Sequence, residues 1–189
     1  MTISRAEAAQ ALSDIDTTTG RSRTFGAYRV TGPILMLWGV IWALGYTGMG
    51  LWPIERWGVV WGVLDVVGVA LTILLARRRS GTAAATAASS VAAWRGLATA
   101  LVIMLFLGAS FAIFQPTDQN AYMTFPVVLA GFIYAGIGIQ RMPRLIWIGA
   151  AMAGIALIGF YAFQPILPFW LAVVGGGGLL AGGLWLRSA

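Results

Sequence analysis

One carboxylate, Asp65, lies near the middle of a long apolar run at about residues 57–76. A charged carboxylate at the centre of a membrane helix costs roughly 2.5–3.5 kcal/mol on insertion scales, so we expect Asp65 to face other helices and to be neutral, paired or hydrated. The polar residues expected at similar depth are its candidate partners: Tyr46, Thr47, Ser110 and Tyr134. Two interpretations stay open: a proton or cation site, or a protonated side chain that joins two helices by hydrogen bonds.

Several residue types that carry chemistry are missing. The chain has no Cys and no His, and all its basic residues are Arg. This composition excludes disulfides, thiolate nucleophiles, ordinary zinc sites and His-ligated haem, and also lysine Schiff bases and P-loops. No segment pairs its carboxylates at a glycosidase-like spacing. We therefore expect a protein that is not an enzyme and that has no metal and no cofactor.

The overall composition is that of a membrane protein. Of 189 residues, 59% are hydrophobic and only 10% are charged, whereas soluble domains are about half apolar and a quarter charged. Continuous apolar runs of about 20 residues favour membrane-spanning helices over alternating strands. We predict an all-α polytopic protein, with an N-terminal segment at 1–30 and a membrane domain at 31–189. Its six predicted spans are at about 33–52, 57–76, 96–114, 122–140, 145–163 and 169–186.

The arginines predict how the chain is oriented. All of them except Arg56 fall on one side of the predicted spans. Because basic residues are retained on the cytoplasmic side, we expect a bacterial inner-membrane protein with both termini in the cytoplasm. The net charge of +6 then reflects topology and attraction to anionic headgroups, with no direct nucleic-acid binding. The arginines assigned to the inner headgroups are Arg77, Arg78, Arg79, Arg141, Arg144 and Arg187.

The N-terminal segment has the pattern of a short amphipathic helix. Ser4 and Glu7 match a capping box, and the residues from Thr17 to Gly20 predict a break before the first span. This helix either rests on the membrane surface or docks a cytoplasmic protein. The candidate docking residues are Ile3, Glu7, Leu12 and Ile15.

Repeated spacings predict three tandem helical hairpins. Arg95 precedes Pro116 by the same distance as Arg144 precedes Pro165, and each hairpin would have the same orientation. Inverted repeats are common in secondary transporters, so this pattern makes a transporter less expected. Residues 77–91 are rich in Ala, Ser, Thr and Gly and are expected to form a flexible linker between the first two hairpins.

Glycines are expected to let the helices approach one another. GxxxG pairs, which bring membrane helices close, occur at Gly58 and Gly62 and at Gly178 and Gly182. The run from Gly175 to Gly178 predicts that the sixth span is central to the bundle. The alternative is that this glycine run breaks the helix and exposes backbone carbonyls to an ion.

Two segments carry a resemblance to known proteins. The odd spans that end at Pro and the ending GGGGLLAGGLWLR resemble small bacterial six-helix inner-membrane proteins built from tandem hairpins, such as the acid-resistance HdeD-type proteins. The stretches ISRAEAAQALSDID and LMLWGVIWALGY are also similar to an uncharacterised proteobacterial membrane family. That second resemblance implies a regulatory partner, such as a winged-helix transcriptional regulator, at residues 1–30.

These observations lead to one expected function and two alternatives. We expect a non-enzymatic sensor, regulatory or stress-related membrane protein whose partners are the lipid bilayer and a cytoplasmic protein. The first alternative is a small transporter or channel that uses Asp65. The second is a structural subunit of a membrane complex, and the Gly-rich faces also permit a homo-oligomer.

Overall fold

The chain folds into long helices. The computed structural model describes residues 5–77, 83–140 and 142–188, and these ranges contain no β-strand. The elements are α1 (Arg5–Leu51), the 3-10 turn η1 (Ile54–Arg56), α2 (Trp57–Arg77), α3 (Ala83–Phe114), α4 (Gln119–Gln140), α5 (Arg144–Ala162), the 3-10 turn η2 (Gln164–Ile166), α6 (Leu167–Trp170), the π-helix η3 (Leu171–Gly176) and α7 (Gly177–Arg187).

Six helical segments of the described chain are long and apolar enough to cross a membrane. Their bounds lie close to the spans predicted from composition, so the all-α class and the number of candidate spans are confirmed. The segments are Phe25–Leu51, Ile54–Leu75, Trp94–Phe114, Gln119–Gln140, Arg144–Ala162 and Gln164–Arg187.

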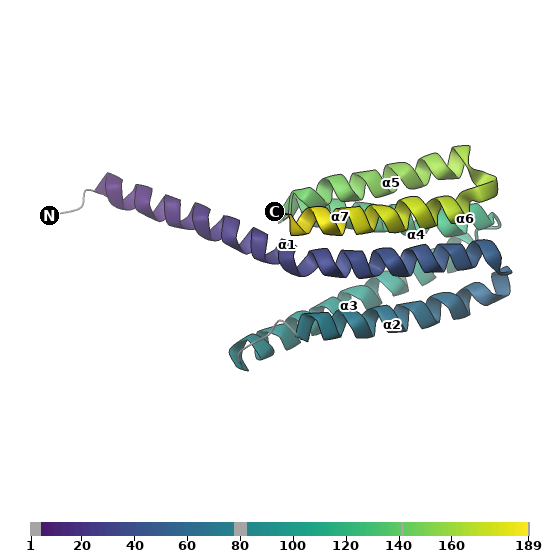
Figure 1. Cartoon of the computed structure of the whole chain (residues 1–189), viewed down its shortest axis with the longest axis horizontal. Helices are drawn as coiled ribbons and strands as arrows, with labels where there is room; N and C mark the ends of the chain where they lie inside the picture. Colours follow the sequence, from purple (N-terminus) through teal and green to yellow (C-terminus); the bar gives the residue numbers. More distant parts are fainter. Residues whose placement is uncertain (1–4, 78–82, 141, 189) are drawn as a thin grey trace.

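Helix α1 is one continuous helix of 47 residues, which corresponds to about 70 Å. Its N-terminal part extends beyond the end of the bundle (Figure 1). The predicted break from Thr17 to Gly20 was wrong, because the helix runs through these residues. Thr and Gly each cost no more than about 1 kcal/mol relative to Ala in a helix. Extending an existing helix through them is easier than forming a new nucleus.

A second correction concerns residues 77–91, which were expected to be a flexible linker. Helix α3 already begins at Ala83, so most of this stretch is helical. Ala is the strongest helix former, and its frequency here outweighs the Ser and Thr that suggested a linker. Arg78 and Arg79 lie outside the described residues.

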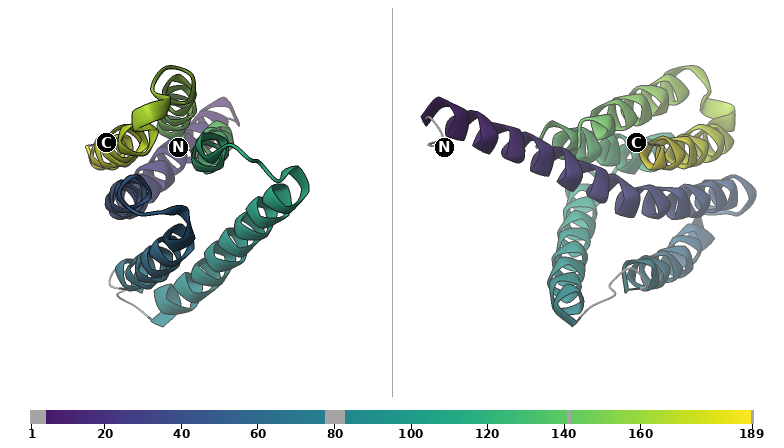
Figure 2. Two further views of the ribbon diagram at one scale, coloured as in Figure 1. Left: turned by 90° about the vertical axis from the view of Figure 1, so that its right-hand side faces the viewer. Right: turned by 60° about the vertical axis from the view of Figure 1, so that its left-hand side comes forward.

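The bundle is arranged around its last span. Helix α4 packs along α5, while α1 packs along η3 and α7, which also contact α5. The segment Gln164–Arg187 is therefore flanked by α1 and α5 (Figure 2), and 44% of its most apolar window is buried. This confirms that the sixth span is central. Helix α2 packs on the outside of α1, and α3 crosses the others obliquely.

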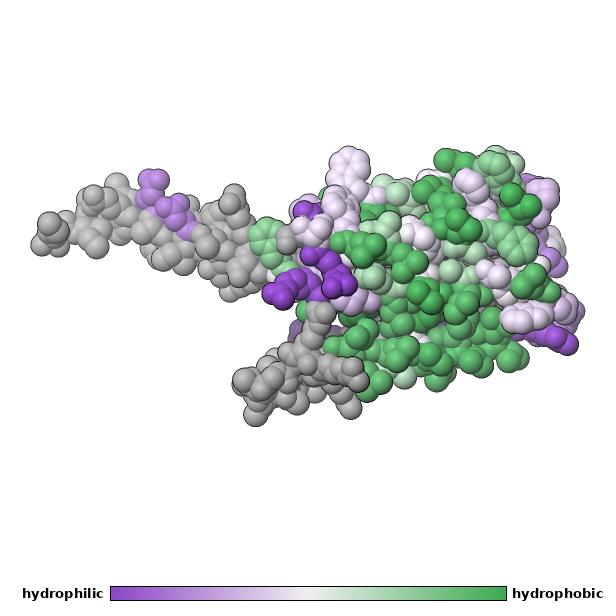
Figure 3. All heavy atoms as spheres, in the orientation of Figure 1, coloured by the Kyte–Doolittle hydropathy of each residue, from purple (hydrophilic) through white to green (hydrophobic). Residues whose placement is uncertain are grey.

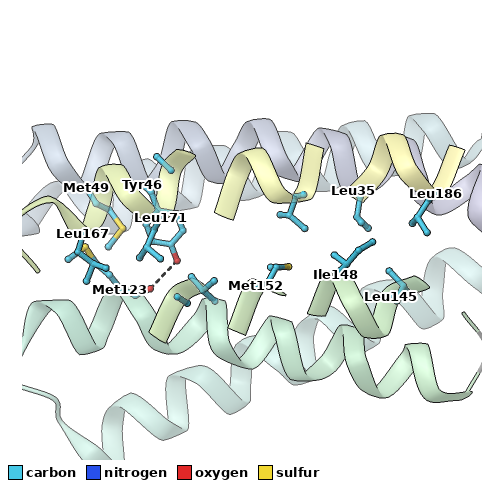
Figure 4. Packing of buried hydrophobic residues seen from close by; sticks show 14 of the residues in the cluster. Leu35, Tyr46, Met49, Met123, Leu145, Ile148, Met152, Leu167, Leu171 and Leu186 are labelled. Atoms are coloured by element: carbon cyan, nitrogen blue, oxygen red, sulfur yellow. Dashed lines mark hydrogen bonds between the residues drawn. The ribbon is translucent and has the colours of Figure 1, made fainter. Parts of the chain in front are cut away.

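Leucine side chains and glycine contacts hold α1, α4, α5 and α7 together. Leu145, Leu167, Leu171, Leu179 and Leu186 are fully buried. In the close-up of the core (Figure 4), Leu145 of α5 and Leu186 of α7 extend into the space between their two helices. In a lipid bilayer, packing of this kind is what favours association between helices, because lipid is as apolar as the helix surfaces and apolar burial alone contributes little.

The closest backbone contacts are made by glycines that the GxxxG pattern did not indicate. A Cβ on Gly39 would lie 2.7 Å from the Gly176 oxygen, and a Cβ on Gly183 would lie 2.6 Å from the Gly32 oxygen. In each helix these two glycines are seven residues apart, a spacing that returns to the same helix face. Gly131 of α4 meets the backbone of α5 in the same way.

Most glycines of the predicted GxxxG pairs do not contact another helix of the described chain. A Cβ on Gly58, Gly62 or Gly178 would meet no atom within 4 Å, and only Gly182 faces a neighbour, Ile148. The prediction that these pairs bring helices of the chain together was therefore wrong for three of the four residues.

The glycine run of the sixth span does not form an open break. Residues from Leu171 to Gly176 form a π-helix, in which each carbonyl still accepts a bond one residue further along than in an α-helix. The Gly177 N–H donates to the carbonyls of Val173 and Val174. Gly175 and Gly176 are buried on the side of α1, so these two residues of the run provide a smooth packing surface, whereas a Cβ on Gly177 or Gly178 would meet nothing within 4 Å.

The outer surface of the bundle is apolar between two polar ends. On the face drawn in Figure 3, hydrophobic residues form a broad band and hydrophilic residues gather at its margins. Large apolar side chains are strongly exposed, among them Val66 of α2 and Ile113 of α3. Apolar area of this extent suits a lipid environment.

Candidate functional site

The predicted polar site lies where α2 packs against α1. Trp61, Asp65, Gly68 and Thr72 of α2 follow one another at intervals of three or four residues, which places them on one face of the helix. The Trp61 ring covers Gly45 of α1, at 2.8 Å from where its Cβ would be. Asp65 therefore shares the face that α2 turns toward α1.

Hydrogen bonds donated by indole N–H groups join α1 to α2. Trp38 Nε1 of α1 donates to Thr72 Oγ1 at 3.2 Å, and Thr72 Oγ1 donates to the Gly68 carbonyl at 2.7 Å. Trp61 Nε1 donates to Met49 Sδ of α1 at 3.2 Å. The ring of Trp38 also lies against Gly68, 3.2 Å from where a Cβ on that glycine would be.

Tyr46 is the most strongly fixed of the predicted site residues. Its hydroxyl donates to the Met123 carbonyl of α4 at 3.0 Å (Figure 4), and the side chain is buried. The ring makes edge contacts with Trp42 and Trp61, at centroid distances of 5.9 and 5.3 Å. Tyr46 thus joins α1 to α4 and also touches the α2 residue one turn before Asp65.

The remaining predicted partners are engaged elsewhere. Thr47 Oγ1 donates to the Ala43 carbonyl of its own helix at 2.7 Å, and Ser110 is buried on α3. Tyr134 packs at the boundary of α4 and α5, where its Cβ faces Gly149. Within the described residues, no hydrogen bond connects the Asp65 carboxylate, which is partly exposed, to any of these four side chains.

The arrangement around Asp65 limits its chemistry. One carboxylate beside an indole and an aliphatic helix face can take up and release a proton or attract a cation. It supplies too few oxygens for a calcium-type site, which takes six to eight. Within the described ranges, no three His, Cys, Asp or Glu residues are close enough to hold a metal ion.

A cluster around Arg144 was not predicted beyond its contact with headgroups. The Arg144 Nη1 donates to the Trp185 carbonyl at 2.6 Å. Its guanidinium lies 5.1 Å from the Trp185 ring centroid and 5.6 Å from that of Tyr28. These distances are typical of cation–π contacts. The sequence did carry a signal for this cluster, because Tyr28, Arg144 and Trp185 each lie within five residues of a predicted span end on the side where most arginines fall.

The other predicted residues are the candidate docking residues and the arginines assigned to the headgroups. Glu7, Leu12 and Ile15 lie on α1, whereas Ile3 and Arg141 fall outside the described residues, so partner docking stays a prediction. Arg77 and Arg187 end α2 and α7. Comparisons with protein-family models, curated proteins and solved structures gave no match.

Proposed function

We propose that this protein spans a bacterial inner membrane with six helices and acts as a non-enzymatic sensor or regulator, with both termini in the cytoplasm. The apolar exterior supports insertion. The described arginines support the orientation, because Arg77, Arg95, Arg144 and Arg187 lie at the ends of candidate spans that face one side, and Arg56 lies in the opposite turn. Retention of arginine on the cytoplasmic side then places both ends inside.

The observation that carries the proposal is the continuity of α1. The part of α1 before the first candidate span, from Arg5 to residue 24, would project about 30 Å from the membrane domain into the cytoplasm. The same helix continues into the core, where Leu35, Ile41 and Tyr46 are buried. A helix without a break transmits a tilt or rotation along its length, whereas a flexible linker does not.

In this proposal α1 connects the membrane bundle to a cytoplasmic protein, for which a transcriptional regulator is the favoured class. A change in the bundle that alters how α1 packs on η3 and α7 would move the projecting segment. Among the described glycines of α1, Gly32 is the first in tight contact with α7. Tyr28, one turn earlier, is still buried against the bundle, so the projecting segment is the part of α1 before Tyr28. The signal would be protonation or the state of the membrane.

The test compares three chains purified in a mild detergent. One is the full-length chain, one lacks residues 2–24, and one carries a helical Ala/Glu/Lys sequence of equal length in their place. Tyr28 is retained in all three, because it is buried against the bundle. We expect a stoichiometric cytoplasmic protein to copurify with the full-length chain alone, at equal thermal stability of the three. Its retention by either altered chain would contradict docking through this segment.

Proton or cation transport through Asp65 is the second candidate. It is favoured by a partly exposed carboxylate on the α1-facing side of α2, in the middle of a candidate span. If it is right, Asp65→Asn abolishes proton flux in proteoliposomes that contain a pH-sensitive dye, while Asp118→Asn, in an exposed turn, leaves the flux unchanged. Equal flux for the Asp65→Asn chain and the unaltered chain would reject it.

A further inference from the structure

An apolar groove runs along the surface between α5 and α7, apart from the polar site. Its volume is about 290 Å³. Residues from both helices line it, among them Trp147, Ala151 and Ile155 of α5 and Gly178, Ala181 and Trp185 of α7.

The shape of the groove suits a hydrocarbon chain. Small residues, Ala151, Gly178 and Ala181, leave room along its length, and a Cβ added to Gly178 would meet no atom within 4 Å. From Trp147 to Ile155 the groove follows about 12 Å of helix. A dry cavity of about 150 Å³ already holds benzene, so this groove has room for a longer hydrocarbon segment.

A fixed positive charge lies at one end of the groove. The guanidinium of Arg144 lies over the ring of Trp185, which lines the groove, and is held by its bond to the Trp185 carbonyl. A guanidinium has five N–H donors, and that bond uses only one of its nitrogens. Among the described residues its other N–H groups make no hydrogen bond, which leaves them available to an oxyanion, and the adjacent helix α7 ends at Arg187.

We propose that this groove binds one acyl chain of an anionic phospholipid, with the headgroup phosphate at Arg144. Guanidinium groups recognise phosphate through paired hydrogen bonds, and the inner leaflet is where anionic lipids are enriched. The inference rests on the bilayer placement in the proposed function but not on a cytoplasmic partner.

The charge at the end of the groove favours a lipid over a second copy of this chain. A second copy inserted with the same orientation would bring its own arginines to the same level as Arg144. Like charges placed together at an interface are unfavourable. A phospholipid instead supplies a negative headgroup at this end and an apolar chain along the remainder.

The test uses the delipidated full chain in detergent, titrated separately with dioleoylphosphatidylglycerol and dioleoylphosphatidylcholine, with bound lipid counted by native mass spectrometry. Gly178→Leu fills the groove. Gly154→Leu is the matched control, because Gly154 lies on the exposed side of α5, where an added Cβ also meets nothing within 4 Å. Arg144→Gln removes the charge, and melting temperatures verify that every variant is folded.

We expect one phosphatidylglycerol to bind about fivefold more tightly than phosphatidylcholine, the factor that one arginine contributes near an anionic surface. Gly178→Leu should lose this site and Gly154→Leu should keep it, while Arg144→Gln should bind both lipids equally. Equal binding of the two lipids by the unaltered chain, retention of the site in Gly178→Leu, or a dimer in place of the lipid complex would overturn the proposal. None of these outcomes depends on copurification of a cytoplasmic protein, so the two proposals can fail separately.

Discussion

Two parts of the molecule are packed very differently, and the more apolar of the two is the less buried. In the segment from Gln164 to Arg187, 44% of the most apolar window is buried, and the corresponding share is 39% in the candidate span of α1. In the candidate spans of α2 and α3 it is only 6% each, although these two have the highest mean hydropathy of the six. Apolar character therefore indicates which segments can enter a membrane, but not which of them pack together.

Glycine placement accounts for the difference. Gly32 of α1 meets Gly183, and Gly39 of α1 meets Gly176. A Cβ on Gly32 or Gly39 would lie 2.8 or 2.7 Å from the backbone oxygen of its partner. On α2 and α3, by contrast, only Gly68 meets a neighbouring helix, whereas Gly58, Gly62, Gly96 and Gly108 face open space. The first set allows close dispersion contacts between helices. The second set makes no such contact with another helix among the described residues.

The largest expected effect comes from filling one of the close contacts. Gly176→Ala would place a Cβ 2.8 Å from both the Gly39 oxygen and the Ala43 Cβ, so η3 and α1 must move apart. Overpacking of this kind costs about 1–3 kcal/mol. We expect the free energy of unfolding in mixed SDS micelles to fall by that amount.

The matched control is Gly62→Ala on α2, where the added methyl group meets nothing within 4 Å. It should be neutral or stabilising by up to about 1 kcal/mol, because Ala favours helix more than Gly does. A loss of stability at Gly62 equal to that at Gly176 would show that α2 packs against something as closely as α1 packs against η3.

A smaller effect is expected at the hydrogen bond that joins α1 to α4. Tyr46→Phe removes the donor to the Met123 carbonyl while keeping the ring contacts with Trp42 and Trp61. Hydrogen bonds between membrane helices contribute about 0.6 kcal/mol on average and up to about 1.7, and the buried position of Tyr46 favours the upper part of this range.

Tyr161→Phe provides the comparison, because Tyr161 is 77% exposed and its hydroxyl bonds no other helix in the part of the chain that the structure describes. Its unfolding free energy should match that of the unaltered chain. If Tyr46→Phe and Tyr161→Phe were equally stable, the hydrogen bond between α1 and α4 would have no role in holding the bundle together.

The contrast between the two regions also explains what the sequence could predict. The candidate spans follow from runs of apolar residues, because a bilayer of fixed thickness imposes a length on each helix. Which glycines are in contact depends on how two helices are rotated toward each other. Gly58 and Gly62 have the same GxxxG spacing as Gly178 and Gly182, yet only Gly182 packs against a neighbouring helix. The seven-residue spacing of Gly32 and Gly39, matched by Gly176 and Gly183, was the available signal.

The polar site was predicted less completely, for a related reason. Position along a predicted span can be read from the sequence, and on that basis Asp65 was grouped with Tyr46, whose ring contacts Trp61, one turn before Asp65. Depth does not give the direction in which a side chain points around its helix. Tyr134 was expected near Asp65 on this basis, but it faces Gly149 of α5.

The smallest expected effect tests how firmly α2 is attached. Thr72→Val removes the hydroxyl that accepts the Trp38 Nε1 bond, and the loss should be about 0.6 kcal/mol, the average for such bonds. Thr99→Val on α3 is the control, because the Thr99 hydroxyl also donates to a carbonyl of its own helix, Arg95, but bonds no other helix. A difference in unfolding free energy between the two variants isolates the contact between helices. No difference would mean that α2 is held to α1 by the packing of Trp61 on Gly45 and of Gly68 on Ile41, with no measurable part played by the indole.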